Sequence, residues 1–224
     1  DIENLERQLV GQDSAPVGKV RLAATDTMVN ALISPMIAEL VREYPDIELE
    51  VLTDNDVLNL SHREADLTLR PVNKPQATLE GERIGTIESA IYAATSYRKR
   101  HTDLDLEHSP EQALWILPDQ SFSHLATGRW YRKHLKNASS IIRCNSLQAM
   151  HALARAGAGL AALPCYLGDS TKELTRLSEP LEGEGVDLWL MVNHDTQQMA
   201  RVRIVMEFLT ARLTQLTPQV EGES

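Results

Sequence analysis

Two short groups of hydrogen-bonding side chains follow strand-like runs and stand where helices are expected to begin. The first group is Thr25, Asp26 and Thr27, and the second is Asn145 and Ser146. Short oxygen-bearing side chains accept hydrogen bonds from the unpaired amides of a helix's first turn, and the same amides can hold a polar or anionic ligand. Helix capping alone would explain why these residue types occur at these positions. Capping and ligand contact therefore both remain possible roles for them. The chemistry offered here is binding through hydrogen bonds.

Residues suited to catalysis or metal binding are few. Asp26, Asp54 and His194 are the only acid or base candidates near the expected site. The sequence has no HExxH, CxxC, GxSxG or P-loop pattern. The run 157–159 (Gly-Ala-Gly) leaves a helix and enters a strand, which reverses the order that a dinucleotide fingerprint needs. We therefore expect no catalytic residue, no metal site and no cofactor.

The first group belongs to a strand–helix–strand unit. Apolar and polar residues alternate over 19–24 and 47–51, and apolar residues recur about every 3.6 positions over 29–44. Short connections between such elements indicate a βαβ unit with a parallel sheet. Ligands of such sheets bind at the carboxyl ends of the strands, beside the helix amino termini. This edge is where Thr25–Thr27 is expected.

A similar pattern recurs in the second half of the chain, where Asn145 and Ser146 precede a second amphipathic helix. Two similar α/β lobes would bring two polar helix starts to one cleft. The elements expected after residue 113 are strands at 114–117, 140–144, 160–163 and 187–193, and helices at 122–135, 147–156 and 199–216.

Composition limits the partners and the location. A formal net charge of −10 on 224 residues gives a surface that repels nucleic-acid phosphates. No apolar run approaches the roughly 20 residues that span a bilayer, and the amino terminus is unlike a signal peptide. Cys144 and Cys165 are too few for a disulfide framework. We expect a cytoplasmic protein without membrane contact.

Several runs, in order along nearly the whole chain, resemble the effector-binding region of LysR-type transcriptional regulators. They are IENLERQL followed by APVGKVRLAAT, the LISPM helix ending in REYPDIELEV, HREADLTLRP, LQAMHALARAGAGLAALP and LWLMVNHDTQQMARVRIVMEFL. The resemblance implies an α/β fold of two Rossmann-like subdomains of periplasmic-binding-protein type II, joined by two crossover strands. It places these crossovers near Ala94–Ser96 and Asn193–Asp195.

The resemblance also implies the domain organisation and the site. Expected are the end of a linker helix and a linker at 1–16, subdomain I at 17–94 plus 195–216, subdomain II at 95–194, and at 217–224 a polar tail with no reason to be ordered. The implied effector cavity is lined from both lobes by Thr25, Asp26, Thr27, Arg70 or Asp54, Thr95, Ser96, Ser121, Phe122, Asn145, Ser146 and His194. The carboxylate of Asp26 would disfavour an anionic effector unless it points away.

The function implied by the resemblance is that of an allosteric sensor and not an enzyme. A small polar molecule binds between the lobes and changes a homodimer, or a tetramer, that contacts DNA only through an upstream helix-turn-helix domain absent from this chain. The expected dimer surface is the helix Asn30–Glu43 with the strand Ile47–Val51, where Met28, Ile33 and Ile37 could meet a partner. The alternatives are a free-standing solute-binding protein of the same fold and an enzyme of this bilobal architecture.

Overall fold

The chain forms two compact units. The computed structural model describes residues 16–53, 65–73, 79–120, 127–138 and 141–222. Unit 1 is formed by the chain up to Gly85 and from Asp187 to Thr217, and unit 2 by Thr86 to Val186 and the residues from Pro218 onward. Within the described residues, no helix combines the length and the apolar character needed to cross a bilayer.

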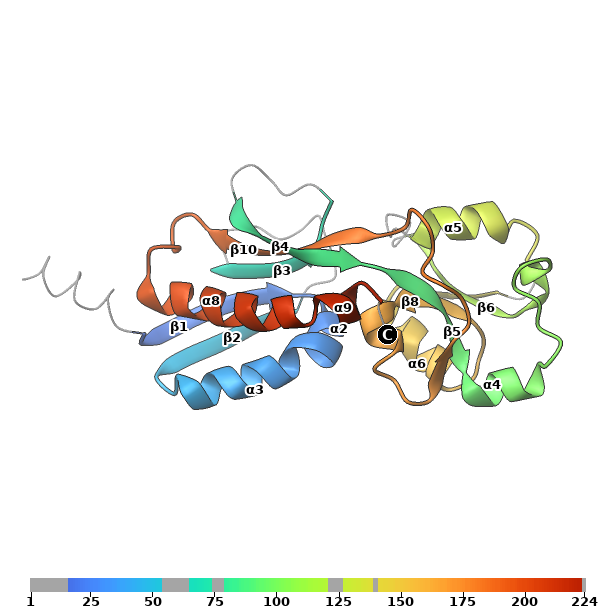
Figure 1. Ribbon diagram of the computed structural model, residues 1–224, viewed down its shortest axis with the longest axis horizontal. Helices are drawn as coiled ribbons and strands as arrows, with labels where there is room; N and C mark the ends of the chain where they lie inside the picture. Colours follow the sequence, from blue (N-terminus) through green and yellow to red (C-terminus); the bar gives the residue numbers. More distant parts are fainter. Residues whose placement is uncertain (1–15, 54–64, 74–78, 121–126, 139–140, 223–224) are drawn as a thin grey trace, which may run out of the picture. The chain divides into compact units, whose positions relative to one another are not determined.

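Unit 1 is built on a five-stranded sheet in the order β2-β1-β3-β10-β4 (Figure 1). β1 pairs in parallel with both β2 and β3, whereas β10 runs antiparallel to β3. The expected βαβ unit is therefore confirmed. The strands are β1 (Gly18–Ala24), β2 (Ile47–Thr53), β3 (Leu67–Pro71), β4 (Leu79–Ile87) and β10 (Val186–Asn193).

The helix between β1 and β2 is continuous but changes its winding. It consists of α2 (Asp26–Met28), the π-helical turn η1 (Val29–Ile33) and α3 (Ser34–Glu43). The amide of Ser34 donates to the carbonyl of Val29, five residues earlier, as π winding requires. A second helix, α8 (Ala200–Gln215), contacts α3, and its Arg212 donates to Glu39 over 2.9 Å. Periodicity near 3.6 does not reveal the π turn, because the apolar pattern continues through it.

Unit 2 contains the antiparallel sheet β8-β5-β9 and the parallel pair β6-β7, which a parallel bridge between Trp115 and Leu160 connects. Along β5, Ile91 and Ala93 contribute to one buried apolar cluster, and Ala90 and Tyr92 to another. Because neighbouring side chains of a strand point to opposite faces, the two clusters lie on opposite faces of this sheet. The elements are β5 (Ser89–Ala94), α4 (Thr95–Arg100), the 3₁₀ turn η2 (Pro110–Gln112), β6 (Trp115–Pro118), α5 (Thr127–His134), β7 (Ile141–Cys144), α6 (Leu147–Arg155), β8 (Ala161–Pro164), α7 (Cys165–Gly168), β9 (Leu174–Arg176) and α9 (Thr217–Val220).

The boundaries between the units differ from those expected at Ala94–Ser96 and Asn193–Asp195. The chain passes from unit 1 to unit 2 at Gly85/Thr86 within β4, and returns at Val186/Asp187 at the start of β10. The expected positions lie at the far ends of β5 and β10 instead. β4 has no regular alternation of apolar and polar residues, so its sequence gives no clear signal of the boundary.

The described part of the C-terminal segment, residues 217–222, is ordered, although a polar tail with no reason to be ordered was expected at 217–224. α9 spans Thr217–Val220, the side chain of Val220 is fully buried, and the chain is counted with unit 2 from Pro218 onward. A single apolar residue in a polar stretch is too weak a signal to predict this.

His151, on the buried side of α6, gives unit 2 a pH dependence. Its Nε2 lies 2.8 Å from the hydroxyl of Thr171, which itself donates to the carbonyl of Leu167, so the neutral ring donates. Burial, and then the nearby charge of Arg155, lower the pKa of His151 below 6.5. The unfolded chain therefore binds this proton more readily, and the free energy of unfolding should fall as the pH drops below about 6.5. Urea unfolding at pH 7.5 and 5.5 should show a smaller pH difference for His151→Gln, and an unchanged difference would contradict this assignment.

Candidate functional site

The carboxyl edge of the unit 1 sheet brings together the first group of predicted site residues. In the register of β1 and β3, Ala24 lies opposite Leu69, so that Thr25 and Arg70 follow side by side. Thr27 and Arg70 are buried, with 2% and 7% of their surface exposed. A buried guanidinium at the sheet edge where the two threonines begin their helix can recognise an anionic or hydrogen-bond-accepting group. β10 begins at this same edge, because Leu188 lies opposite Pro71.

The side chains of Thr25 and Asp26 cap their own helix. The amide of Met28 donates to Oγ1 of Thr25 over 3.4 Å, and the amide of Thr27 donates to Oδ1 of Asp26 over 2.6 Å. The hydroxyls of Thr25 and Thr27 are 3.2 Å apart. Two amides of the first turn are thus already bonded, which makes the helix end a weaker anion site than the sequence suggests. The carboxylate of Asp26 turns back to its own backbone, and Arg70 supplies the positive charge.

The carboxyl edge of unit 2 holds the second group. Pro118 and Cys144 are opposite each other at the ends of β6 and β7, and the amide of Asp119 donates to the carbonyl of Cys144 over 2.8 Å. Ser146 then caps α6 by accepting from the amide of Ala149 over 3.3 Å. β5 starts at this edge, because Ser89 lies opposite Pro164, the last residue of β8. Asp119 was not predicted as a site residue, although its place directly after a buried strand is a signal that could have indicated it.

Thr95 and Ser96 lie at the opposite edge of unit 2. β5 runs antiparallel to β8 and spans six residues, or about 20 Å, from the crossover side to Ala94. The hydroxyl of Thr95 is 2.9 Å from that of Thr175, and Ser96 Oγ lies beside Gly157, at the carboxyl end of α6. Thr95 and Ser96, expected as hinge residues that line the cavity, thus lie at the far end of β5 from the Gly85/Thr86 boundary, and their contact with an effector stays a prediction.

His194 lies at the edge of unit 1 opposite to Thr25. β10 is antiparallel to β3, so that its end, after Val192 opposite Leu67, lies at the amino end of β3. His194 is exposed, 3.7 Å from Glu80 and 2.7 Å from the side-chain amide of Gln197. His194 is therefore not at the edge where Thr25 lies, and its expected role at the rim of the cavity stays a prediction. Ser121, Phe122 and Asp54 lie outside the described residues.

A separate cavity of about 500 Å³ lies wholly within unit 2. Apolar walls from Ile91, Trp130 and Leu181 enclose it, and Arg98 and Asp105 contribute polar groups. Both polar groups are bonded locally, since Arg98 donates to carbonyls at the end of α4 and Asp105 accepts from the following turn. No predicted site residue lines this cavity.

Comparison with known proteins identifies the fold and the family. The family model described as LysR substrate binding domain matches residues 13–214. The regulatory domain of CrgA from Neisseria meningitidis superposes with a TM-score of 0.75 at 19% identity, over 88% of this chain and all of that one. The AmpR effector-binding domain from Citrobacter freundii gives 0.71 at 14% identity, over 88% of this chain and 99% of that one. Both are solved structures of the bilobal periplasmic-binding-protein type II fold.

Curated relatives are longer than this chain. An HTH-type transcriptional regulator of Xanthomonas campestris is 29% identical over 101 residues, which are 45% of this chain and 29% of that protein. The probable regulator LtrA of Klebsiella pneumoniae is 24% identical over 91% of this chain and 67% of its own length. The chain spans less than half of several such regulators. Since the family model matches far more than half of the residues, the chain belongs to the LysR substrate binding domain family.

Proposed function

We propose that this domain senses a small polar effector for a cytoplasmic, DNA-binding transcriptional regulator, and that it has no enzymatic activity of its own. The observation that carries the proposal is the buried Arg70 at the carboxyl edge of the unit 1 sheet, the same edge at which Thr25 and Thr27 begin their helix. The effector would present an anionic or hydrogen-bond-accepting group to Arg70. DNA contact would belong to a further domain of the regulator, because the net charge of −10 does not suit phosphate binding.

The second half of the proposed site is the carboxyl edge of unit 2, with Asp119, Asn145 and Ser146. In each unit a strand next to the boundary starts at the proposed edge, since β10 begins at the carboxyl edge of unit 1 and β5 begins at the carboxyl edge of unit 2. An effector that contacts both edges favours one arrangement of the units over another by its difference in affinity, typically ~1–3 kcal/mol. An enzyme would need a catalytic acid or base at this site. Two of the candidates do not fit that role, because Asp26 caps its own helix and His194 lies at the other edge of the unit 1 sheet.

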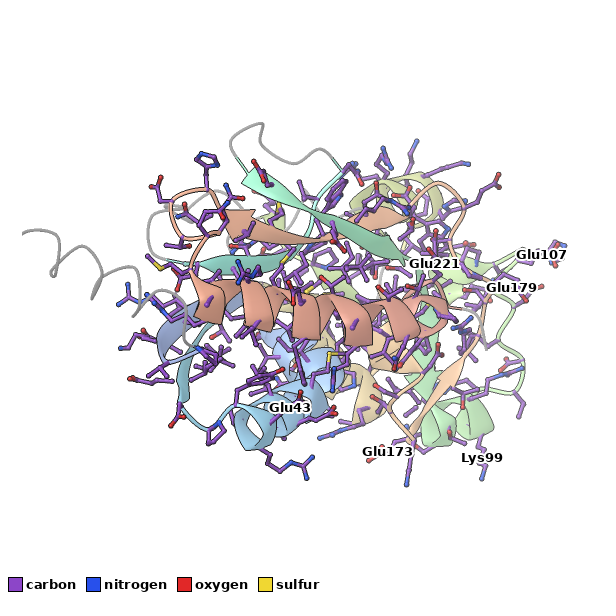
Figure 2. All side chains as sticks on the ribbon, turned by 60° about the vertical axis from the view of Figure 1, so that its left-hand side comes forward. Glu43, Lys99, Glu107, Glu173, Glu179 and Glu221 are labelled. Carbon is purple, nitrogen blue, oxygen red and sulfur yellow. The ribbon has the colours of Figure 1, made fainter. Side chains whose placement is uncertain are left out.

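Signal transmission would use the helix that starts at the site. α2, η1 and α3 run without a break from Asp26 to Glu43, and we propose that the exposed face of α3 with the edge strand β2 forms a homodimer surface. Val41 on this face has 43% of its surface exposed, and Figure 2 labels Glu43 at the end of α3. Met28 and Ile33, which were expected to meet a partner, are buried within unit 1 instead.

A thermal-shift screen against small organic acids, sugar phosphates and amino acids tests the site. Thr25→Val should weaken the binding of any hit by about tenfold, because it removes one hydrogen bond to the effector. The measured quantity is the ligand-induced change in melting temperature, since the lost helix cap also lowers the melting temperature of the free protein. Thr95→Val is the matched control, because Thr95 lies at the other edge. Equal ligand responses in the two variants would contradict the proposed site.

The dimer surface is tested by a charge on Val41. Val41→Asp should weaken self-association by at least about tenfold, since it places an uncompensated carboxylate against an apolar contact. Val17→Asp is the control, because Val17 is a similarly exposed valine of unit 1, with 51% of its surface exposed, that belongs to neither α3 nor β2. Sedimentation velocity over a range of concentrations gives the dissociation constants. A dimer that tolerates Asp at position 41 as well as at position 17 would exclude this surface.

A further inference from the structure

The chain joins the two units a third time, through its C-terminal segment. α8 belongs to unit 1 and ends at Gln215, and the residues from Pro218 onward belong to unit 2. We call residues 217–222 the C-terminal strap. A bilobal fold needs only two crossovers, here within β4 and at the start of β10, so the strap is an additional connection whose contacts indicate its role.

The strap follows the β4 crossover on one side. The hydroxyl of Thr217 donates to the carbonyl of Ile84 over 3.0 Å, within unit 1. Within unit 2, the amide of Thr86 donates to Oε1 of Glu221 over 3.1 Å, and the amide of Glu88 donates to the carbonyl of Val220 over 3.2 Å. Backbone groups of alternate residues in a strand point to the same side, and residues 84, 86 and 88 are alternate. The strap thus bonds to the crossover immediately before and after Gly85.

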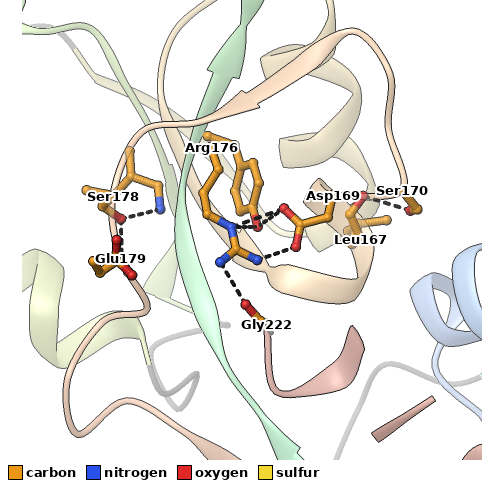
Figure 3. Close-up of polar contacts among 9 residues, drawn as sticks. Leu167, Asp169, Ser170, Arg176, Ser178, Glu179 and Gly222 are labelled. Atoms are coloured by element: carbon orange, nitrogen blue, oxygen red, sulfur yellow. Dashed lines mark hydrogen bonds and ion pairs between the residues drawn. The ribbon is translucent and has the colours of Figure 1, made fainter. Parts of the chain in front are cut away.

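The end of the strap is anchored in unit 2 by a charged network (Figure 3). Nη1 of Arg176 donates to the carbonyl of Gly222 over 2.9 Å, while the same guanidinium forms an ion pair with Asp169 and donates to the hydroxyl of Tyr92 over 3.2 Å. Gly222 has a φ of +73°, and a Cβ at this position would lie 2.8 Å from Sγ of Cys165. Only glycine fits this contact.

Two carboxylates, those of Glu88 and Glu221, lie near each other where the strap meets the crossover. Burial, and then the carboxylate of Glu221, raise the pKa of Glu88 above its usual value. When both carboxylates are ionised they repel each other beside the crossover. The strap therefore combines specific hydrogen bonds with a built-in repulsion, as expected of a segment that can detach without unfolding either unit.

We propose that residues 217–222 form a releasable strap that restricts the relative motion of the two units by holding the β4 crossover. While the strap is bound, residues 84–88 cannot change their backbone angles freely, because their hydrogen bonds to the strap would break. Release leaves two connections in place of three and widens the range of arrangements available to the units. The proposal concerns this chain with or without an effector, so it can fail independently of the proposed function.

Hydrogen exchange at the Thr86 and Glu88 amides tests whether the strap holds the crossover. Removing the residues after Thr217 should accelerate exchange at both amides by about tenfold or more. The amides of Leu177 and Leu181, which donate to Ile91 and Ser89, should keep their rates. Unchanged exchange at Thr86 and Glu88 would overturn the proposal.

A single substitution repeats the test in the full-length chain. Gly222→Ala should detach the strap, because its Cβ meets Cys165, and should reproduce the effect of truncation on both amides. Gly183→Ala is the matched control, since Gly183 has a φ of +74° and open space around a Cβ. Equal exchange rates in these two variants would count against the anchor at Gly222. Glu88→Gln should act in the opposite direction and slow exchange at Thr86.

Electron-spin distance measurements test the effect on motion. Spin labels are attached at Lys99→Cys in unit 2 and at Arg203→Cys in unit 1, which are both exposed positions; Lys99 is labelled in Figure 2. The labelled protein carries Cys144→Ser and is diluted with unlabelled protein. The measured distribution of label-to-label distances reports how widely the arrangement of the units varies. Truncation after Thr217 should broaden this distribution. A truncated chain with the same distribution as the intact chain would overturn the proposal even if the two amides exchanged faster.

Discussion

Replacing Arg70 by methionine is expected to weaken effector binding by about 100-fold. A buried ionic hydrogen bond that loses one partner costs roughly 2–5 kcal/mol, of which about 2.7 kcal/mol corresponds to two orders of magnitude. Arg70 has only 7% of its surface exposed and is adjacent to Thr25 in the β1–β3 register, so bulk water would not replace its contact with a ligand. Methionine keeps most of the length and apolar surface of the side chain. Isothermal titration calorimetry with the strongest hit of the screen gives the affinity.

The control for Arg70 is an arginine of the same sheet that faces solvent. Arg21 forms an exposed ion pair with Glu50 over 2.9 Å, and Arg21→Met should change the affinity by less than about twofold. Circular dichroism of both variants shows whether the fold is retained. If a folded Arg70→Met variant binds the hit as tightly as the Arg21→Met variant, the effector does not use Arg70, and the charge assigned to the site is wrong.

Replacing Trp115 by alanine is expected to lower the free energy of unfolding of unit 2 by about 3–5 kcal/mol. Trp115 is fully buried, its ring lies 5.6 Å from that of Trp130, and its Nε1 donates to the carbonyl of Pro110 over 2.7 Å. It also forms the bridge that connects β6 to β8. Its loss would leave a cavity in the apolar core of unit 2 and remove one of the two hydrogen bonds that the carbonyl of Pro110 accepts. Urea unfolding monitored by far-ultraviolet circular dichroism measures the change.

Trp130 provides the matched control for this prediction. It contacts the same apolar cluster but is only half-buried, and its ring stacks on His134 at 4.6 Å. Trp130→Ala should cost about half as much as Trp115→Ala, because less apolar surface leaves water on folding at this position. Equal losses for the two variants would indicate that burial at the β6–β8 bridge is not the source of stability.

The sequence predicts well those parts of the fold that depend on local periodicity. Apolar residues alternate with polar ones along β1 and β2 and recur at the helical period in the helix between them, and these elements form as predicted. Thr25 and Ser146 cap helices, also as predicted. The unit boundaries differ from the expected crossovers because the irregular pattern of β4 and the start of β10 contain no local signal of a boundary. The π turn was missed because its apolar residues fit the helical period on both sides.

The placement of Thr95 and His194 at other edges than expected has a different cause, which is strand direction. Thr95 and His194 both follow strands, as Thr25 does, but β5 and β10 run antiparallel to their neighbours. The same type of residue at the end of a strand therefore lies at the opposite edge of the sheet. Side-chain periodicity gives the face that each residue occupies but contains no information on the direction of a strand in its sheet.

The position of β10 in the unit 1 sheet has a consequence for synthesis on the ribosome. β10 lies between β3 and β4, yet the ribosome makes it only after all of β5–β9. Until then β4 has no partner and β3 has an open edge, whereas the nascent strands of unit 2 already have theirs. Unit 2 should therefore fold first during translation, and the waiting strands of unit 1 would be the segments that a chaperone protects.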